Sequence, residues 1–266
     1  MREETIPCVF CGVATSPWKG LDSAYRECPS CQLVARAKIP NPDELDAMYA
    51  GYYSNENITG GTTEMESSDV ALRAHAKFLA GKVLKPGMRV LDFGAGIGTF
   101  SHDLKQRGFD VDGLEYSEGA RETARERFGM GLYATLNDLE KGRYDLIVMI
   151  EVIEHLTAPW ETLRALRECL APGGRIYLTT PNRNGFWARL YGAKWREAKP
   201  FHLMLFNAHA LSRMLRDCGF INVQGIRFSP LTTGAVLTQV LHRFLQATSL
   251  YGGVRMFGCR ADGLNR

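Results

Sequence analysis

The chain has 266 residues, of which 45% are hydrophobic and 23% are charged, and its formal net charge is +3. This size and composition are ordinary for a globular protein with one α/β domain and a small accessory module. The weak charge, without a basic cluster, argues against a nucleic-acid partner, since phosphate binding concentrates Lys and Arg. The acidic start, Met1 to Glu4, has no signal pattern, and no apolar run reaches the roughly 18 residues of a spanning helix. We therefore expect a cytoplasmic protein without a membrane span.

Four of the seven cysteines form two Cys-x-x-Cys pairs near the start of the chain. Cys8 and Cys11 form the first pair, and Cys28 and Cys31 form the second. Each pair aims two sulfurs at one point, so the two pairs together offer a closed tetrahedral set of thiolates. In a chain without an export pattern, this spacing predicts a structural zinc site rather than disulfides. A redox-active dithiol and cysteines without a shared role are the alternatives.

The residues around these cysteines fit a zinc ribbon. About forty residues are too few for a stable core, so metal binding would supply the missing folding free energy. We expect Tyr25, before the second pair, and Leu33 and Val34, after it, to lie on strands. Given the weak charge, the ribbon fits a brace of the fold or a wall of the substrate pocket better than a reader of nucleic acid.

The rest of the chain alternates between strand-like and helix-like patterns, which predicts a parallel sheet covered by helices. The expected strands are 89–93, 109–115, a weak strand near Leu132, 144–150, 174–180, 221–227 and 254–259. The expected helices are 69–84, 98–107, 117–128, 158–170, 207–218 and an apolar helix at 235–249.

A glycine run follows the first of these strands. Asp92 lies near the strand end and is followed by Gly94, Gly96 and Gly98. Glycines let the backbone turn sharply and approach a ligand closely. Glu115 ends the next strand-like run about twenty residues later, where an acidic side chain can hold a ribose hydroxyl pair. A dinucleotide fingerprint would place a further glycine at Thr99, so the loop indicates a different nucleoside ligand.

With this glycine spacing, the sequence resembles the class I S-adenosylmethionine (SAM)-dependent methyltransferases, of the type 11 and type 23 kinds. Two later segments carry the resemblance further: Tyr144–Leu156 looks like the family's fourth-strand motif, and Leu170–Asn182 looks like its turn and fifth strand. The resemblance spans about residues 70 to 260. It implies an α/β fold, with a Rossmann-like seven-stranded sheet and helices on both faces, and the cysteine pattern adds a small N-terminal zinc ribbon.

The resemblance divides the chain into three parts. These are a zinc-ribbon module (1–40), a helical lid or linker region (41–87) and a SAM-binding methyltransferase domain (88–266). Within the last, Asp92 would orient the glycine loop and the ammonium group of the methionine part of SAM. The backbone of Gly94, Ala95 and Gly96 would pass under that methionine part.

The resemblance also assigns the nucleoside end of SAM. Glu115 would bind the ribose hydroxyls, and Tyr116 would flank the adenine, although Tyr116 could also be a core residue. Asn137 or Asp138 would lie near the adenine amino group, although Asp138 could be a solvated turn residue. Glu151, at the end of the fourth strand, completes the predicted cofactor-binding set.

Methyl transfer is an in-line displacement at the sulfonium methyl, so the protein mainly aligns the two reactants. An oxygen acceptor also benefits from a base, and His202 and His155 are the predicted catalytic residues. His202 follows the fifth strand, in a segment that often lines the acceptor pocket in this family, although it could also be a pocket-wall or packing histidine. His155 follows the fourth strand, where parallel sheets bind ligands, although its Glu-His-Leu motif also suits a shared structural role.

Two groups of aromatic residues are candidates for covering the site. The first is predicted as a lid, or as a stripe packed on the core, and comprises Tyr49, Tyr52 and Tyr53. The second lies in an insertion after the fifth strand, as an acceptor-binding flap or a packing cluster, and comprises Phe186, Trp187, Tyr191 and Trp195.

Together these features predict a SAM-dependent methyltransferase acting on a small-molecule acceptor, such as a sugar, a polysaccharide or lipid precursor or a secondary metabolite. O-methylation with a histidine base is the favoured chemistry. An RNA methyltransferase that recognises its substrate through the ribbon is one alternative, but Glu151–Glu154 stands where base-modifying enzymes carry Asn/Asp-Pro-Pro-Tyr/Phe. A SAM-binding protein without catalysis is the other.

Overall fold

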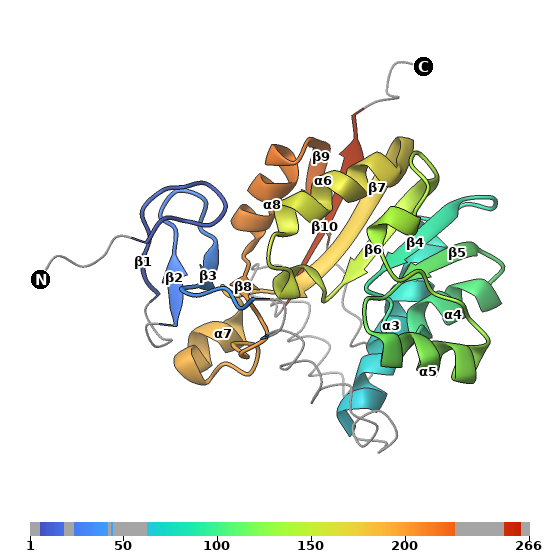
Figure 1. Ribbon diagram of the computed structural model, residues 1–266, viewed down its shortest axis with the longest axis horizontal. Coiled ribbons are helices and arrows are strands. Elements are labelled where there is room, and N and C mark those ends of the chain that lie inside the picture. Colours follow the sequence, from blue (N-terminus) through green and yellow to red (C-terminus); the bar gives the residue numbers. More distant parts are fainter. Residues whose placement is uncertain (1–5, 19–23, 42–43, 45–62, 227–252, 262–266) are drawn as a thin grey trace, which may run out of the picture.

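The computed structural model describes residues 6–18, 24–41, 44, 63–226 and 253–261. Among these residues the strands form two sheets, which Figure 1 shows side by side. The larger has six strands in the order β5-β4-β6-β7-β10-β9. Their bounds are Asp110–Leu114 (β5), Arg89–Phe93 (β4), Tyr144–Ile150 (β6), Leu170–Pro181 (β7), Gly253–Arg260 (β10) and Phe220–Gly225 (β9).

Helices connect and cover these strands. They are α3 (Thr63–Lys82), α4 (Thr99–Gln106), α5 (Glu118–Phe128), α6 (Pro159–Cys169), α7 (Phe186–Tyr191) and α8 (Ala208–Asp217). Short 3-10 turns lie at Leu136–Asp138 (η1), Ile153–His155 (η2) and Gly192–Lys194 (η3). Within the described part of the chain, no helix is long and apolar enough to cross a bilayer.

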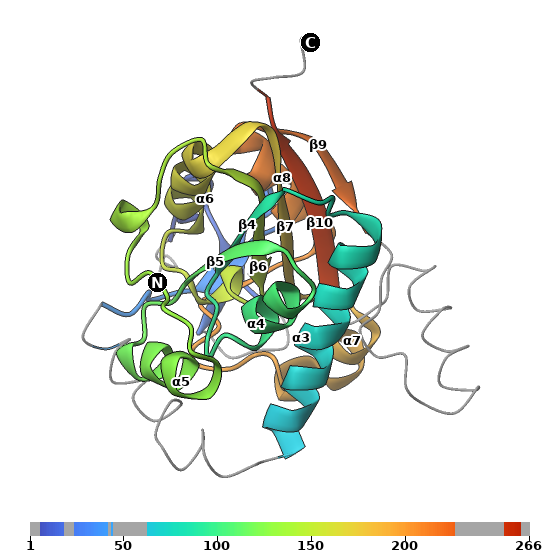
Figure 2. The ribbon, with the colours of Figure 1, turned by 90° about the vertical axis from the view of Figure 1, so that its right-hand side faces the viewer.

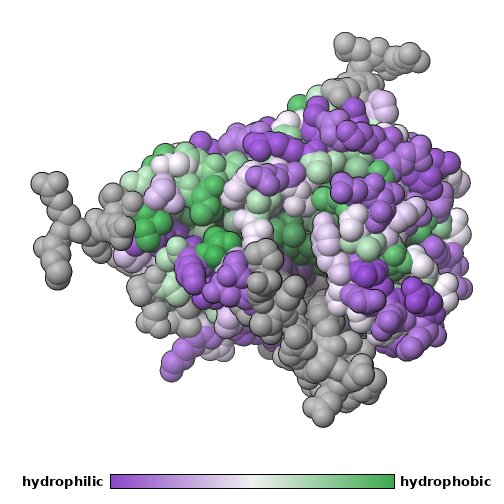
Figure 3. All heavy atoms as spheres, in the orientation of Figure 1, coloured by the Kyte–Doolittle hydropathy of each residue, from purple (hydrophilic) through white to green (hydrophobic). Residues whose placement is uncertain are grey.

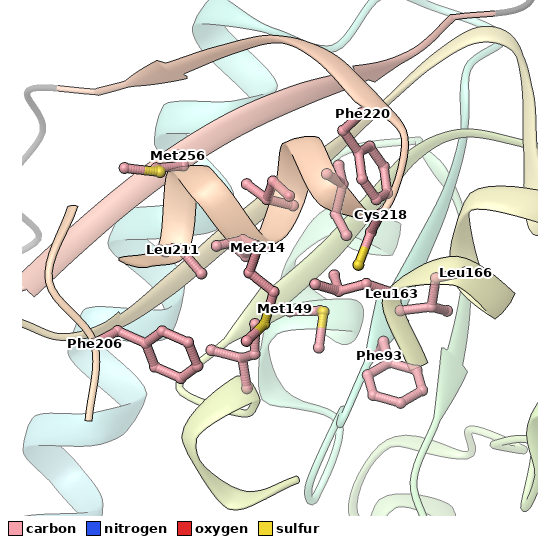
Figure 4. Packing of buried hydrophobic residues seen from close by; sticks show 14 of the residues in the cluster. Phe93, Met149, Leu163, Leu166, Phe206, Leu211, Met214, Cys218, Phe220 and Met256 are labelled. Carbon is pink, nitrogen blue, oxygen red and sulfur yellow. The ribbon is translucent and has the colours of Figure 1, made fainter. Parts of the chain in front are cut away.

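The sheet is buried on both faces, as expected for strands that read as continuous apolar runs. Ile147 of β6 packs in the cluster that contains α6 and α8, whereas its neighbour Val148 packs in the cluster that contains α3 and α4. Figure 2 shows α3 and α4 lying beside each other on the same face of the sheet. On the other face, Figure 4 shows Met149 of β6 between Leu163 of α6 and Met214 of α8.

The smaller sheet joins the N-terminal module to the rest of the molecule. Its order is β1-β2-β3-β8, with bounds Ser16–Pro17, Tyr25–Glu27, Val34–Arg36 and Met204–Leu205. The first three strands follow the predicted ribbon, but β8 comes from the segment after β7. The surface over this module is notably hydrophobic in Figure 3, and it exposes Val9 (41%) and Val13 (39%).

Two expectations about the large sheet were wrong. It has six strands in the described residues rather than seven, because the weak strand near Leu132 is reduced to a single bridge between Leu114 and Tyr133. The sheet is also mixed rather than parallel, because β10 runs antiparallel to both β7 and β9. The other strand and helix predictions in the described residues are confirmed to within a few residues, except that β7 begins earlier, at Leu170, and α3 at Thr63. The three lid tyrosines and the apolar helix at 235–249 lie outside the described residues.

Candidate functional site

The glycine loop connects β4 to α4 and has a backbone that few other residues could adopt. Gly94, Gly96 and Gly98 all have positive φ, at 78°, 54° and 84°. At Gly94 a side chain is also excluded by contact, because a Cβ there would lie 2.5 Å from a methyl group of Val152. The loop amides of Gly94 and Ala95 donate to the carbonyl of Leu114 at 2.8 and 2.9 Å. The loop therefore lies directly against the ends of β5 and β6.

Glu115 holds the glycine loop and the end of β5 together. One carboxylate oxygen accepts from the Gly96 amide at 2.9 Å, and the other accepts from the Ser117 amide at 2.9 Å. The side chain of Arg121 donates to the Glu115 carbonyl at 2.8 Å. Each carboxylate oxygen can accept more than one hydrogen bond. The carboxylate thus lies at the carboxyl ends of two neighbouring parallel strands, where α/β sheets bind ligands.

Asp92 is buried on β4, where it supports the start of α4. Its carboxylate accepts from the Ser101 hydroxyl at 2.6 Å. Burial raises the pKa of this carboxyl to about 7, and the hydrogen bond from Ser101 opposes that rise. The structure therefore brings Asp92 beneath the loop that it was predicted to orient.

The predicted adenine contacts lie on exposed positions. Tyr116 is 53% exposed, and its ring meets Phe93 edge-on with centroids 6.1 Å apart. Asn137 and Asp138 lie in η1 on the surface. The Asp138 carboxylate accepts from the backbone amide and hydroxyl of Thr135 in a capping box. This carboxylate therefore already stabilises the start of η1.

Glu151 directly follows β6 and has an unusual backbone conformation, with a φ of 55° in a residue that is not glycine. Such outliers concentrate at functional sites. Its carboxylate accepts from the Thr179 hydroxyl at 2.8 Å. Although Glu151 is exposed to solvent, the protein that surrounds it raises the pKa of its carboxyl.

The two predicted catalytic histidines are brought together with Glu154, a residue that the sequence motifs did not single out. One ligand atom each of Glu154, His155 and His202 lies within 4.8 Å of the other two. The two imidazole rings are 4.7 Å apart and nearly perpendicular. Glu154 and His202 are buried, whereas His155 is half-buried and gives the cluster its contact with solvent. We call these three residues the Glu-His-His cluster.

Burial governs the protonation of this cluster. It lowers the pKa of His155 to about 4 and that of His202 to about 3, so both rings are neutral near pH 7. Burial, reinforced by the nearby charge of Glu151, raises the pKa of Glu154 well above its usual value. The spacing Glu151-x-x-Glu154-His155 was a signal for Glu154 in the sequence, but roles were predicted for Glu151 and His155 only.

The segment that carries His202 is held by the N-terminal module. The Tyr25 hydroxyl, on β2, lies 2.9 Å from the Lys199 carbonyl and 2.8 Å from the His202 carbonyl. The Arg36 amide donates to the Leu203 carbonyl at 2.9 Å. Just beyond this segment, β8 pairs with β3. The module is therefore a direct support of this part of the candidate site.

Two side-chain pairs join the N-terminal module to further segments of the main domain. Arg183, which follows β7, is buried and contacts Glu27 of β2 at 2.6 Å. The side-chain amide of Asn207, at the start of α8, donates to the Gln32 side chain at 3.0 Å. The module thus contacts the main domain at several separate places along the chain, including Arg213 of α8, which donates to Ser30.

The four paired cysteines gather in the module as predicted. The sulfurs of Cys8 and Cys31 are 3.6 Å apart, and those of Cys11 and Cys28 are 3.4 Å apart. All four sulfurs lie within 4.8 Å of one another. Zn–S bonds of about 2.3 Å in a tetrahedron would place sulfurs about 3.8 Å apart, so the set fits one zinc ion.

The aromatic insertion divides into two parts. Trp195 is buried and packs against Tyr25, Val34 and Leu205 of the smaller sheet. The other three residues lie on α7 with more than a third of their surface exposed, and they are Phe186, Trp187 and Tyr191. The packing role predicted for the insertion therefore applies to Trp195, and the flap role of the α7 residues stays a prediction.

Comparison with known proteins places this geometry in context. The model of a family described as a methyltransferase domain matches residues 67–224. The ubiquinone biosynthesis O-methyltransferase of an Azoarcus species is 30% identical to the chain in an alignment of 166 residues that covers 55% of this chain and 70% of that protein.

Solved structures share the fold at low identity. A SAM-dependent methyltransferase of Thermotoga maritima, described as a possible histamine N-methyltransferase, matches with a TM-score of 0.56 at 22% identity, covering 81% of this chain and 99% of that one. A 1,6-didemethyltoxoflavin-N1-methyltransferase of Burkholderia thailandensis, with bound S-adenosylhomocysteine, matches with a TM-score of 0.57 at 16% identity, covering 87% and 96%. These similarities confirm the predicted Rossmann-like fold.

Proposed function

The chain belongs to the methyltransferase-domain family, as a class I SAM-dependent methyltransferase, and we propose that it methylates a hydroxyl oxygen of a small-molecule acceptor. The observation that carries this proposal is the Glu115 carboxylate, which joins the Gly96 amide to the end of β5. Oxygen as the receiving atom is supported by the O-methyltransferase named above. The acceptor class we propose is a sugar, a polysaccharide or lipid precursor or a secondary metabolite.

The donor half of the site is proposed to hold SAM along the loop between β4 and α4. Gly94, Ala95 and Gly96 offer backbone without bulky side chains to the methionine part, and Asp92 supports the loop from below. Glu115 accepts hydrogen bonds from the ribose hydroxyls. Its existing bonds to two backbone amides orient the carboxylate before SAM arrives.

The remaining predicted donor residues are proposed to surround the nucleoside and the reacting end. Tyr116 offers an exposed ring beside the ribose-binding carboxylate, where it can flank the adenine. Asn137 is the better candidate of η1 for the adenine amino group, because Asp138 is engaged as a cap. Glu151 lies at the end of β6, beside Val152, which contacts the glycine loop.

The acceptor half is proposed to be the Glu-His-His cluster and the neighbouring side chain of Glu151, which follows β6. The acceptor oxygen attacks the methyl carbon of SAM while the carbon–sulfur bond breaks and its electron pair stays on sulfur. The products are the methyl ether and S-adenosylhomocysteine. The hydroxyl proton leaves at the cluster, where the neutral imidazoles can relay it to solvent, although pKa values of about 4 for His155 and about 3 for His202 make both rings weak bases.

We further propose that Cys8, Cys11, Cys28 and Cys31 hold a structural zinc ion. Four thiolates close the coordination sphere and leave no position for a reactant. The ion's task is then to fold the module that holds the His202 segment through Tyr25. Elemental analysis of the purified protein tests this directly, because zinc absent from protein made in zinc-containing medium would exclude the ribbon.

The function is tested by incubating the protein with methyl-labelled SAM and bacterial extract and identifying the labelled product. We expect label in a small molecule that is stable to the mild base that hydrolyses methyl esters. Glu115→Ala should weaken SAM binding about tenfold or more, through loss of a charge-assisted set of hydrogen bonds. Glu118→Ala is the matched control, because Glu118 is an exposed carboxylate at the start of α5. Equal losses for the two variants, or label in RNA, would overturn the proposal.

A further inference from the structure

The Glu-His-His cluster contains buried polar atoms that have no partner among the described residues. Both carboxylate oxygens of Glu154 and the Nδ1 atom of His202 are in this state. The side chain of Glu154 belongs to a residue that is 1% exposed, and His202 is 4% exposed. The Thr180 hydroxyl lies close to Glu154 without reaching hydrogen-bond geometry. Leaving such groups unpaired costs about 1–3 kcal/mol each, and more for a charged group.

Each of the two imidazole rings already has one hydrogen bond to a backbone carbonyl. His155 Nδ1 lies 3.1 Å from the Phe201 carbonyl, so this nitrogen carries the proton and Nε2 keeps its lone pair. A hydrogen bond to the backbone of Glu197 engages the His202 ring, and its Nδ1 atom is the one left without a partner. Metal-binding histidines characteristically donate one ring N–H to a carbonyl in this way, which aims the other nitrogen at the ion.

From these contacts we propose that Glu154, His155 and His202 form a second metal site, which binds a divalent cation of the zinc type. The three ligand atoms are close enough to share one ion. A pair of imidazoles with one carboxylate suits Zn²⁺ or a similar transition metal, whereas Mg²⁺ favours oxygen ligands and retained water. One ion would satisfy the unpaired carboxylate oxygens of Glu154 and the unpaired Nδ1 atom of His202.

The proposed site differs from the four-cysteine cluster because its protein ligands do not fill every coordination position of the metal. Three protein ligands leave a coordination position for a further group, as in catalytic rather than structural sites. His155 is half-buried, so solvent reaches at least one of the three ligands. A bound divalent metal lowers the pKa of an oxygen ligand. The use of the ion to ionise the acceptor hydroxyl rests on the proposed function, but the binding of the ion does not.

The test is equilibrium dialysis of the full chain, with its cysteine site already filled, against Zn²⁺ followed by elemental analysis. We expect a second equivalent of Zn²⁺ in the wild type. Glu154→Gln and His202→Asn should each weaken this second binding at least about tenfold, the range seen when metal-site residues are altered. His209→Ala is the matched control, because His209 is an exposed histidine on the neighbouring helix α8, and it should bind as the wild type does.

Cobalt substitution keeps the proposal testable if a variant fails to fold. Co²⁺ in the second site of the wild type should give no sulfur-to-cobalt charge-transfer absorption, since no thiolate is a ligand there. Retention of one equivalent only, an equal loss in His209→Ala, or binding of Mg²⁺ as tight as that of Zn²⁺ would each overturn the proposal. The measurement uses neither SAM nor acceptor, so a failed methyl-transfer assay would bear on the proposed function alone.

Discussion

The donor side and the acceptor side of this domain are assembled in different ways. The proposed donor contacts from Asp92 to Glu115 lie on two adjacent strands and the loop between β4 and α4. The Glu-His-His cluster combines η2 with a segment near residue 202, and that segment is held by Tyr25 of the N-terminal module. Local contacts therefore dominate one side and long-range contacts dominate the other. Perturbations of the two sides should separate SAM binding from methyl transfer.

The largest effect is expected where the two sides touch, at Gly94 and Val152. In Gly94→Ala the new Cβ would lie 2.5 Å from a Val152 methyl, in a backbone with a φ of 78°. We expect SAM binding to weaken about a hundredfold or more, because the loop must shift away from β6, and the fold to lose about 1–3 kcal/mol. Calorimetry with SAM and urea unfolding measure the two quantities.

Gly108→Ala is the control for backbone strain alone. Gly108 has a φ of 86°, but a Cβ there would meet no atom within 4 Å. It should cost about 1–2 kcal/mol of stability and leave SAM binding unchanged. The second change Val152→Ala in the Gly94→Ala background should restore part of the affinity. A Gly108→Ala variant that loses SAM binding to the same extent would contradict the contact explanation.

The next largest effect should follow from opening the cysteine cluster. Cys28→Ser removes one buried thiolate and, with it, the zinc-dependent folding of the module. We expect methyl transfer to fall about tenfold or more, because the His202 segment loses its support, while SAM affinity stays within about threefold. Cys259→Ser, at a half-buried thiol on β10, should change neither. Parallel loss of SAM binding and transfer would show that the two sides are one cooperative unit.

A smaller effect should isolate the link between the module and His202. Tyr25→Phe removes a hydroxyl that lies within hydrogen-bond distance of two carbonyls, and the expected cost is about 1–2 kcal/mol. If the loss of these contacts displaces His202, the same free energy is added to the barrier of methyl transfer. In that case kcat should drop about five- to thirtyfold with the KM for SAM unchanged. Tyr144→Phe, which removes a hydroxyl that donates to the Asp112 carboxylate at 3.0 Å at the other end of β6, is the control. A drop in stability without a change in kcat would limit Tyr25 to a folding role.

The same contrast explains what sequence reasoning could predict. The glycine loop and Glu115 belong to one short stretch, where spacing alone brings residues together. Asp138 was assigned by resemblance, and no pattern in the sequence showed that its carboxylate would cap η1. The pairing of β3 with β8 joins segments that are far apart in the chain, so local periodicity carries no signal for it. Glu154 was missed because its burial beside His202 depends on that long-range arrangement.

The smallest expected effect tests the donor side through Asp92. Burial raises the pKa of this carboxyl from 3.8 to about 7 in the folded protein. Between pH 6 and pH 8 the unfolded chain has already released this proton and the folded protein has not fully done so, which lowers the free energy of unfolding as pH rises. The expected loss is about 1 kcal/mol, and Asp92→Asn should abolish this contribution. Urea unfolding at pH 6, 7 and 8 measures it.

Ser101→Ala supplies the opposite change for Asp92. The Ser101 hydroxyl donates to the charged carboxylate at 2.6 Å and lowers its pKa. Its removal should therefore shift the pH-dependent loss of stability to higher pH rather than abolish it. A shift to lower pH would mean that Ser101 does not stabilise the ionised form. Asp92 lies under the glycine loop and far along the chain from the module, so neither Asp92→Asn nor Ser101→Ala should alter Zn²⁺ binding. A change in Zn²⁺ binding in either variant would show that the donor side and the acceptor side are coupled.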